Sequence, residues 1–253
     1  MPPQPEDPDR LLAVLSEAAE AVADALASTA DWGETGGRPG EHHSDLAADA
    51  AAVGVIESAG LGVLSEESGS TSPRRAVTVV VDPLDGSTNA SRRLSWWATS
   101  LCAVDDTGPL AALVVDLRHG VRWTAVRGRG AFRDGEQIRS SGRVDLGDAI
   151  VGLNGVPSGH GGWAQYRVLG AAALDLCAVA DGTLDGYLDC TTDELGVWDY
   201  LGGALVCAEA GAVVVDAFDR DLCVLDHAAR RTPVAGSTEV LRDALVARHP
   251  SRS

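Results

Sequence analysis

Apolar residues recur with helical spacing in two stretches near the start of the chain. Residues 9–28 place apolar side chains on one stripe of a helix, which comprises Leu11, Leu12, Leu15, Val22 and Leu26. Residues 45–59 predict a second helix, which we expect to end at Gly60. The side chains expected to face inward from this second helix are Leu46, Val53 and Ile56. The pattern therefore predicts two helices before the first strand.

Between residues 61 and 138 the pattern changes to short apolar runs separated by turn residues. Residues 61–64 and 77–81 are predicted strands, with a polar loop between them that ends at Arg75. The turns Asp-Asp-Thr-Gly-Pro and Arg-His-Gly divide the next runs, which predict a β-meander with strands at 98–104, 110–117 and 121–126. Residues 131–138 contain Asp-Gly, a hairpin signal. The first half is therefore expected to be two helices followed by a largely antiparallel sheet.

Predicted strands and helices alternate after a polar stretch at residues 140–148. The strands are expected at 149–153, 184–188, 212–215 and 233–235, and the helices at 170–181, 198–210 and 238–248. Such alternation is typical of an α/β arrangement, so the whole chain falls in a mixed α+β and α/β class. We place a soft boundary between an N-terminal part, 1–145, and a C-terminal part, 146–253. Together they are expected to form one compact catalytic unit.

The charge balance narrows the range of partners. The chain has 37 acidic and 20 basic residues, a formal net charge of −17, and all of its basic side chains other than histidine are arginines. This balance argues against a nucleic acid polymer or an anionic membrane as partner. It leaves open a small phosphorylated substrate, provided that a cation mediates binding. The absence of lysine excludes Schiff-base chemistry.

Cysteine usage and the N-terminus bear on location. The five cysteines form no Cys-x-x-Cys pair and most have apolar neighbours, which favours buried free thiols in a reducing compartment. Residues 1–10 are proline-rich and acidic, unlike a signal peptide. No apolar run approaches the ~18 residues of a membrane span. We therefore interpret the protein as cytoplasmic.

The most informative stretch is residues 77–89, Val-Thr-Val-Val-Val-Asp-Pro-Leu-Asp-Gly-Ser-Thr-Asn. Two carboxylates, Asp82 and Asp85, follow a buried strand with no Lys or Arg between residues 76 and 91, and such burial is unfavourable without a partner. Mg²⁺ is a suitable partner because it prefers carboxylate oxygens. Gly86 and Ser87 then offer backbone N–H groups at a possible helix start, which is an anion site. The alternative is an ordinary turn, since Asp-Pro and Asp-Gly are common turn dipeptides.

Acidic residues also stand at the ends of other apolar segments, at Asp45, Glu66 and Asp199. Asp199 has a simpler explanation when taken alone, because an acidic residue in the first turn of a helix complements the helix dipole. The number of these acidic residues is what favours metal-assisted phosphoryl chemistry. The aspartates of the central motif are three residues apart, so the motif lacks the Asp-x-Asp of the haloacid-dehalogenase phosphatases.

Four segments together resemble one known family. Asp82–Asn89 is similar to the first signature of the inositol monophosphatase family, Asp-Pro-hydrophobic-Asp-Gly-Thr/Ser, and Trp198–Gly203 to its second, Trp-Asp-x-Ala-Ala/Gly-Gly. Ser65–Ser68 resembles the family's Gly-Glu-Glu-Ser, and Gly170–Cys177 its Gly-Ser/Thr-Ala-Ala-Leu. All four occur in the family's order. The resemblance implies a layered α-β-α-β-α sandwich of the inositol monophosphatase and fructose-1,6-bisphosphatase type, usually dimeric.

The resemblance also implies roles for individual residues. Glu66, Asp82 and the Leu84 carbonyl would hold one Mg²⁺, and Asp82, Asp85 and Asp199 a second; a third, looser ion would rest on Glu66 through water. Gly86 and Ser87 would present backbone N–H groups to the phosphate. Asp45 and the Ser87 hydroxyl would orient the attacking water, with Glu66 completing the catalytic set. The substrate side would comprise Gly170, Ala171, Ala172, Asp189 and Asp199.

Departures from the family's pattern concern the substrate. Asp189 stands where the inositol enzymes have a Glu that contacts substrate hydroxyls, and the loop from 189 to 196 is longer than usual. His42 and His43 replace other residues before Asp45, and we expect them to be exposed loop residues rather than ligand contacts.

The sequence thus predicts a lithium-sensitive, Mg²⁺-dependent phosphomonoesterase, a hydrolase acting on inositol-1-phosphate or a related cyclitol or sugar phosphate. The alternatives are a same-fold phosphatase for histidinol phosphate, fructose 1,6-bisphosphate or adenosine 3′,5′-bisphosphate, and a metal- or phosphate-binding regulator without turnover.

Overall fold

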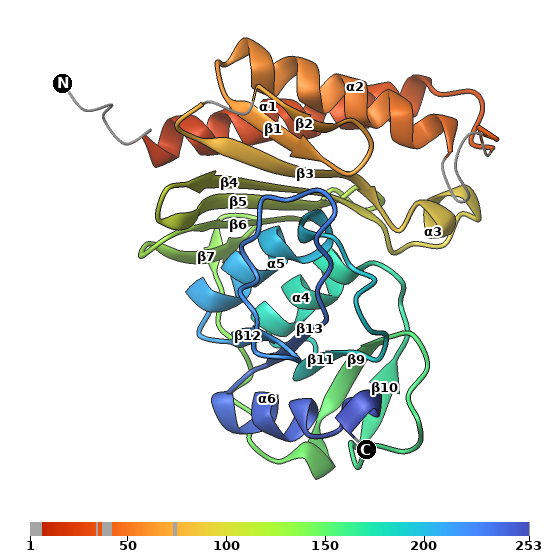
Figure 1. Ribbon diagram of the computed structural model, residues 1–253, viewed down its shortest axis with the longest axis vertical. Coiled ribbons are helices and arrows are strands. Elements are labelled where there is room, and N and C mark those ends of the chain that lie inside the picture. Colours follow the sequence, from red (N-terminus) through yellow and green to blue (C-terminus); the bar gives the residue numbers. More distant parts are fainter. Residues whose placement is uncertain (1–6, 34, 37–41, 73–74, 253) are drawn as a thin grey trace.

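Helices and sheets alternate in five layers in the computed structural model, which describes residues 7–33, 35–36, 42–72 and 75–252 (Figure 1). Helices α1 and α2 form the outer layer and cover one face of an eight-stranded sheet. Helices α4 and α5 lie between that sheet and a second, five-stranded sheet, whose far face is covered by α6. This arrangement confirms the predicted α-β-α-β-α sandwich.

The outer layer consists of α1 (Pro8–Ser28) and α2 (His43–Ser58), both close to their predicted bounds. The prediction for the inward face of α2 was partly wrong: Ile56 is buried, but Leu46 is 41% exposed. The residues that α2 buries are Ser44, Asp45, Ala48, Asp49, Ala52 and Ile56. The helix is rotated away from its most apolar orientation because two carboxylates, Asp45 and Asp49, occupy the inner face.

The first sheet has the strand order β2-β1-β3-β4-β5-β6-β7-β8, and all of its neighbouring strands are antiparallel except β1 and β3. Its strands are β1 (Gly62–Ser65), β2 (Gly69–Thr71), β3 (Thr78–Asp85), β4 (Ala98–Asp105), β5 (Gly108–Asp116), β6 (Arg122–Val126), β7 (Gly130–Arg133) and β8 (Glu136–Gln137). A largely antiparallel sheet was predicted, but β2 was expected to be loop. Its three residues are polar and pair with β1 through the backbone, so they leave no hydrophobic period.

Strand β3 continues past its predicted end at Val81 as far as Asp85. Between Asp82 and Asp85 the register against β4 shifts: Asp82 lies opposite Ser100, and Asp85 lies opposite Ala98. Three steps along β3 therefore match two along β4, which is a β-bulge, and Pro83 lies inside it. The strand was predicted to end early because Asp and Pro are poor strand formers, while a bulge tolerates both.

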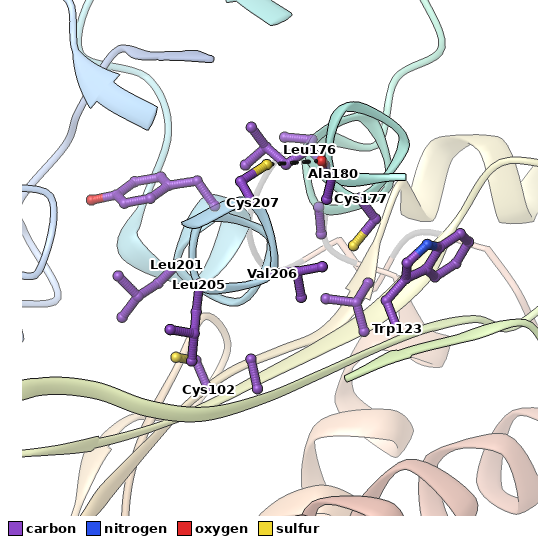
Figure 2. Close-up of a cluster of buried hydrophobic side chains, with 14 of the residues drawn as sticks. Cys102, Trp123, Leu176, Cys177, Ala180, Leu201, Leu205, Val206 and Cys207 are labelled. Carbon is purple, nitrogen blue, oxygen red and sulfur yellow. Dashed lines mark hydrogen bonds between the residues drawn. The ribbon is translucent and has the colours of Figure 1, made fainter. Parts of the chain in front are cut away.

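Helices α4 (Ala172–Ala180) and α5 (Val197–Glu209) pack closely in the middle layer. A Cβ atom on Gly203 would lie 2.7 Å from the Leu176 Cβ of α4, and one on Gly202 would lie 2.7 Å from the Ser100 Oγ of β4. Figure 2 shows the apolar cluster that results, in which the Cys207 Sγ donates to the Leu176 carbonyl at 3.0 Å. The two glycines therefore let α5 approach both α4 and the first sheet.

The second sheet has the order β10-β9-β11-β13-β12, with β9 (Ile150–Asn154), β10 (Gln165–Arg167), β11 (Gly186–Asp189), β12 (Val213–Asp216) and β13 (Pro233–Gly236). Helix α6 (Glu239–Val246) packs on it, and short 3₁₀ turns occupy Leu146–Asp148 and Pro250–Arg252. Strand β10 was not predicted, since it has three exposed residues.

The five cysteines are free, and four are buried, as predicted. No helix in the described part of the chain has the length and apolarity needed to cross a bilayer.

Candidate active site

Three carboxylates gather where the β3 bulge meets the start of α5. Asp82, Asp85 and Asp199 each offer one oxygen, and these oxygens all lie within 4.8 Å of one another. Asp82 and Asp85 stand at the two ends of the bulge, and Asp199 is the third residue of α5. The sequence prediction had placed all three in one metal set, and the structure brings them together.

Backbone N–H groups orient each of these carboxylates. The Leu84 N–H donates to Asp82 Oδ1 at 3.0 Å, within the bulge itself. The Ala173 N–H, in the first turn of α4, donates to Asp85 Oδ2 at 2.8 Å. The Gly196 N–H donates to Asp199 Oδ2 at 2.6 Å. The three acids are therefore held by the strand, by α4 and by α5 rather than by mobile side chains.

The electrostatics of the cluster favour a cation. Burial raises the pKa of Asp85 and of Asp199 to about 8. Burial, and then the neighbouring charges of Glu66, Asp85 and Asp199, raise the pKa of Asp82 well above its usual value. Such a group of like charges must either take up protons or bind a positive ion. The donor set, made of carboxylate oxygens, fits a hard divalent cation such as Mg²⁺.

Glu66 joins the group through the pairing of β1 with β3. The two strands are parallel with Ser65 opposite Val81, so the next residues, Glu66 and Asp82, are also neighbours. The Glu66 N–H donates to the Val81 carbonyl at 3.1 Å, which continues this register by one residue. Its charge raises the pKa of both Asp82 and Asp85.

The predicted phosphate residues lie beside the start of α3 (Ser87–Ser91). Gly86 caps this helix with φ 82°, and a Cβ there would lie 3.0 Å from the Trp96 carbonyl and 3.1 Å from the Gly170 carbonyl. A side chain at Gly86 would therefore be crowded by both carbonyl oxygens and strained by the positive φ. Ala171 is the N-cap of α4 and lies 3.2 Å from the position of that Cβ, and Ala172 is the first residue of the helix. The structure therefore brings Gly170 and Ala171 beside Gly86.

Asp45 lies in the first turn of α2 and is buried. Its carboxylate accepts from the His42 N–H at 2.9 Å and from the Ser44 hydroxyl at 3.3 Å. One turn further along, Asp49 accepts from the Ser65 hydroxyl, and Ser65 is the residue before Glu66. Because Asp45 and Asp49 share a helix face, Asp45 faces the same end of β1 as Glu66.

The prediction for His42 was wrong, and that for His43 is confirmed in its exposure only, since His43 is the first residue of α2 rather than a loop residue. His42 is only 7% exposed, and its Nδ1 lies 3.4 Å from the Asp45 carboxylate. It is the N-cap of α2, which begins two residues earlier than predicted, so it is packed at the helix start instead of lying in a loop. The side chain of His43 is half exposed.

Asp189, the predicted substrate contact, ends β11 and is fully buried. Its Oδ1 accepts from the Asn154 amide at 3.0 Å and from the Thr191 N–H at 2.9 Å. Its Oδ2 has no hydrogen-bond partner among the described residues. The charge of Asp189 raises the pKa of Asp199, so the two acids are neighbours.

Two buried groups near the cluster were not predicted from the sequence. Asp175 of α4 is 1% exposed, accepts from the Trp96 indole N–H at 2.9 Å, and has its pKa raised by burial to about 8. The Tyr187 hydroxyl is buried without a hydrogen-bond partner among the described residues, and its pKa is raised by burial and by the nearby charges of Asp189 and Asp175. The presence of an acid inside the otherwise apolar run of α4 is the sequence signal that could have indicated Asp175.

This fold and acidic site define a class of protein. The chain matches the model of the inositol monophosphatase family over residues 10–250, and it therefore belongs to that family.

Individual proteins support the same assignment. The chain is 31% identical to the fructose-1,6-bisphosphatase/inositol-1-monophosphatase of Methanothermobacter thermautotrophicus over 89% of this chain and 91% of that one. It is 34% identical to Nus factor SuhB of Escherichia coli over 61% of this chain and 62% of that protein. A hypothetical protein from Pyrococcus horikoshii with similarities for inositol-1 monophosphatase shares the fold, with a TM-score of 0.81, 22% identity and coverage of 95% and 96%.

Proposed function

We propose that the protein is a Mg²⁺-dependent phosphomonoesterase that hydrolyses inositol-1-phosphate or a related small cyclitol or sugar phosphate. The observation that carries this proposal is the cluster of Asp82, Asp85 and Asp199, whose oxygens lie within 4.8 Å of one another beside the start of α3. Acidic residues alone would repel a phosphate, so the cluster is suited to such a substrate only with cations present.

Up to three Mg²⁺ ions would bind in the site. Glu66, Asp82 and the Leu84 carbonyl would hold one ion, Asp82, Asp85 and Asp199 a second, and Glu66 a third through water. When bound, these ions would neutralise phosphate charge and lower the pKa of a water molecule. The raised pKa values of Asp85 and Asp199 support this assignment, because burial disfavours their ionised forms and a bound cation would stabilise them.

The remaining residues would position the reactants. Gly86 and Ser87 would donate backbone N–H groups to the phosphate, as a helix start does. Asp45 and the Ser87 hydroxyl would orient the attacking water. Burial raises the pKa of Asp45, which makes its carboxylate a better proton acceptor. The substrate's hydroxyl side would meet Gly170–Ala172 and Asp189, whose Oδ2 has no other hydrogen-bond partner among the described residues.

The choice of substrate rests on the relatives as well as on the site. A relative whose name includes both fructose-1,6-bisphosphatase and inositol-1-monophosphatase covers most of this chain, so both substrates belong in the test. Histidinol phosphate and adenosine 3′,5′-bisphosphate are the other candidates. A regulator without turnover is the second candidate function, and the similarity to proteins named Nus factor favours it. The full acidic set favours the enzyme.

The site draws on both parts of the chain, which we propose to act as one catalytic unit. Glu66, Asp82 and Asp85 precede residue 145, and Asp199 follows it. A homodimer in the cytoplasm completes the proposal, and it rests on the family resemblance and on the sequence. Light scattering of the purified protein tests the dimer.

Phosphate release from a substrate panel is the experiment that tests the function. Inositol-1-phosphate, fructose 1,6-bisphosphate, histidinol phosphate and adenosine 3′,5′-bisphosphate would each be offered with Mg²⁺ and with EDTA. We expect turnover of one or more of them that EDTA abolishes and that millimolar Li⁺ inhibits. Turnover that persists in EDTA would remove the metal mechanism, and silence across the panel would favour the regulator.

A further inference from the structure

The connection between β12 and β13 crosses from the second sheet to the first. We call residues 217–232 the strap. In Figure 1 the strap is the blue coil that rises from the second sheet, passes α5 and reaches the level of β3. It contains no helix or strand, yet hydrogen bonds fix it at its base, at its middle and at its tip.

The base of the strap is held by Asp216, the last residue of β12. Its carboxylate accepts from the Phe218 N–H at 2.8 Å, from the Thr232 N–H at 2.9 Å, and from Arg220 through Nε and Nη2, both at 2.9 Å. Burial alone would raise the pKa of Asp216, but these bonds, above all those from Arg220, hold it below its usual value. Both ends of the strap therefore meet at one charged anchor.

The middle of the strap is fastened to α5. The Tyr200 hydroxyl donates to the Leu222 carbonyl at 2.9 Å, and Tyr200 is the residue after Asp199. The strap is thus tied to the helix that carries one acid of the candidate site.

The tip of the strap contacts both sides of the acidic cluster. His227 Nε2 lies 3.0 Å from the Glu66 carbonyl oxygen. The His227 ring also packs on the ring of Trp198, the residue before Asp199, with centroids 4.8 Å apart. The Arg230 guanidinium lies over the same Trp198 ring at 5.1 Å and donates to the His227 carbonyl at 2.8 Å. One imidazole therefore connects the end of β1 to the first turn of α5.

We propose that His227 is a positioning residue that fixes Glu66 at the distance from Asp199 that metal binding requires. The assignment of Glu66 and Asp199 as ligands rests on the proposed function. Glu66 follows a strand of the first sheet, whereas Asp199 belongs to a helix of the middle layer, so their separation depends on contacts that join the two. Mg²⁺ accepts little deviation from octahedral geometry, so a small displacement of Glu66 weakens its binding.

The hydrogen bond to Glu66 defines which substitutions are informative. A carbonyl oxygen accepts only, so His227 must carry its proton on Nε2 in this contact. Glutamine has an amide N–H at nearly the same distance from the backbone and keeps the bond. Leucine keeps the bulk against Trp198 but loses the donor.

The test measures Mg²⁺ binding by calorimetry on the intact protein without substrate. For His227→Leu we expect an increase in the Mg²⁺ dissociation constant of about 10-fold, since contacts behind metal ligands typically contribute 10–100-fold. His227→Gln should stay within about 3-fold of the wild type. In assays with saturating Mg²⁺, the kcat of His227→Leu should approach that of the wild type. The control is His119→Leu, because the His119 side chain is half exposed and pairs with Asp116 at the end of β5, two strands away from Asp85.

Each outcome decides the inference. Equal Mg²⁺ affinity of His227→Leu and wild type overturns it, as does a His227→Gln variant no better than His227→Leu. If His227→Leu does not fold, His227→Asn replaces it, because asparagine is polar but too short to reach Glu66. A wild type that binds Mg²⁺ but hydrolyses no substrate overturns the proposed function alone. A wild type that binds no Mg²⁺ overturns both.

Discussion

The β3 bulge and the strap hold the acidic cluster by different means. The bulge presents Asp82 and Asp85 within four consecutive residues, and its own Leu84 N–H orients one of them. The strap carries none of the clustered acids and contacts them through neighbours, at the Glu66 carbonyl and the Trp198 ring. The bulge therefore carries the charged ligands, and the strap sets their spacing. We call the bulge the charge side of the site and the strap its distance side.

This difference shows which parts of the sequence determine the ligands and which parts determine the spacing between them. Ligands on a strand with a fixed bulge need a particular short sequence, because each side chain must appear at one position. A positioning coil needs only a few anchors, here Asp216, Tyr200 and His227, and leaves the residues between them free to change. We therefore expect substitutions on the charge side to abolish activity, and substitutions on the distance side to change metal affinity in graded steps.

The largest effect should come from Asp199→Asn. The asparagine oxygen still accepts from the Gly196 N–H, so the start of α5 should remain intact. The loss of one charge from the three-carboxylate cluster should lower kcat/KM by more than about 100-fold, the upper end of what even contacts behind a ligand contribute. Phosphate release measures the activity, and thermal melting verifies the fold.

A matched control for that variant is Asp134→Asn. Asp134 is exposed in the β7–β8 turn at φ 50°, a conformation that asparagine also tolerates. The Asp134→Asn variant should therefore retain the wild-type activity. If Asp199→Asn retained half of the wild-type activity, Asp199 would have to be removed from the metal set.

A second prediction concerns the apoprotein and pH. Because the pKa values of Asp85 and Asp199 are near 8 in the folded state and near 4 when unfolded, the folded state binds more protons between these limits. Stability is then full below about pH 4 and is lost as the pH rises through 8. In EDTA the melting temperature should fall between pH 5.5 and 8.5, and added Mg²⁺ should stabilise more at the higher pH.

The same measurement on Asp199→Asn sharpens this prediction. The variant lacks one of the groups whose pKa burial raises to about 8, the others being Asp85 and Asp175, so its melting temperature in EDTA should depend less steeply on pH. Asp105 and Asp216, whose pKa values are lowered by hydrogen bonds despite burial, act below this window and do not interfere. An apoprotein whose melting temperature rises with pH would show that the cluster is not the site of uncompensated charge.

The charge side of the site could be predicted from the sequence. Asp82, Asp85 and Asp199 stand in short motifs, and the amphipathic or β-branched runs beside them fix the elements that carry them. Glu66 was predicted from its family-like motif, and the parallel pairing of β1 with β3, which was not predicted, brings it beside Asp82. The bulge itself was missed because its Asp-Pro sequence resembles a turn.

The distance side could not be predicted, for physical reasons. The strap has no hydrophobic period, and its anchors depend on contacts between residues far apart in sequence, such as His227 with Glu66. The burial of His42 has a similar cause, because it results from the packing of α2 against the rest of the protein rather than from local propensity. The same applies to Leu46, which is exposed because the inner face of α2 carries Asp45 and Asp49.

The smallest effect should come from Tyr200→Phe, which loosens the middle of the strap and leaves its tip in place. The variant removes the hydroxyl that donates to the Leu222 carbonyl at 2.9 Å, and a hydrogen bond of this kind contributes about 1 kcal/mol to the free energy of unfolding. We expect a melting temperature lower by about 2–4 °C. The loss of Mg²⁺ affinity should be smaller in Tyr200→Phe than in His227→Leu, because His227 still holds Glu66.

Tyr166→Phe is the matched control, since Tyr166 is 51% exposed on β10, outside the acidic cluster, and should change neither quantity. The double variant Tyr200→Phe/His227→Leu then decides whether the strap acts as one unit. If the middle anchor works through the tip, the loss of Mg²⁺ affinity in the double variant should be close to that of His227→Leu alone, since residues in one network do not add. Additive losses would mean that Tyr200 affects Asp199 directly through α5, and the strap would then be two separate supports.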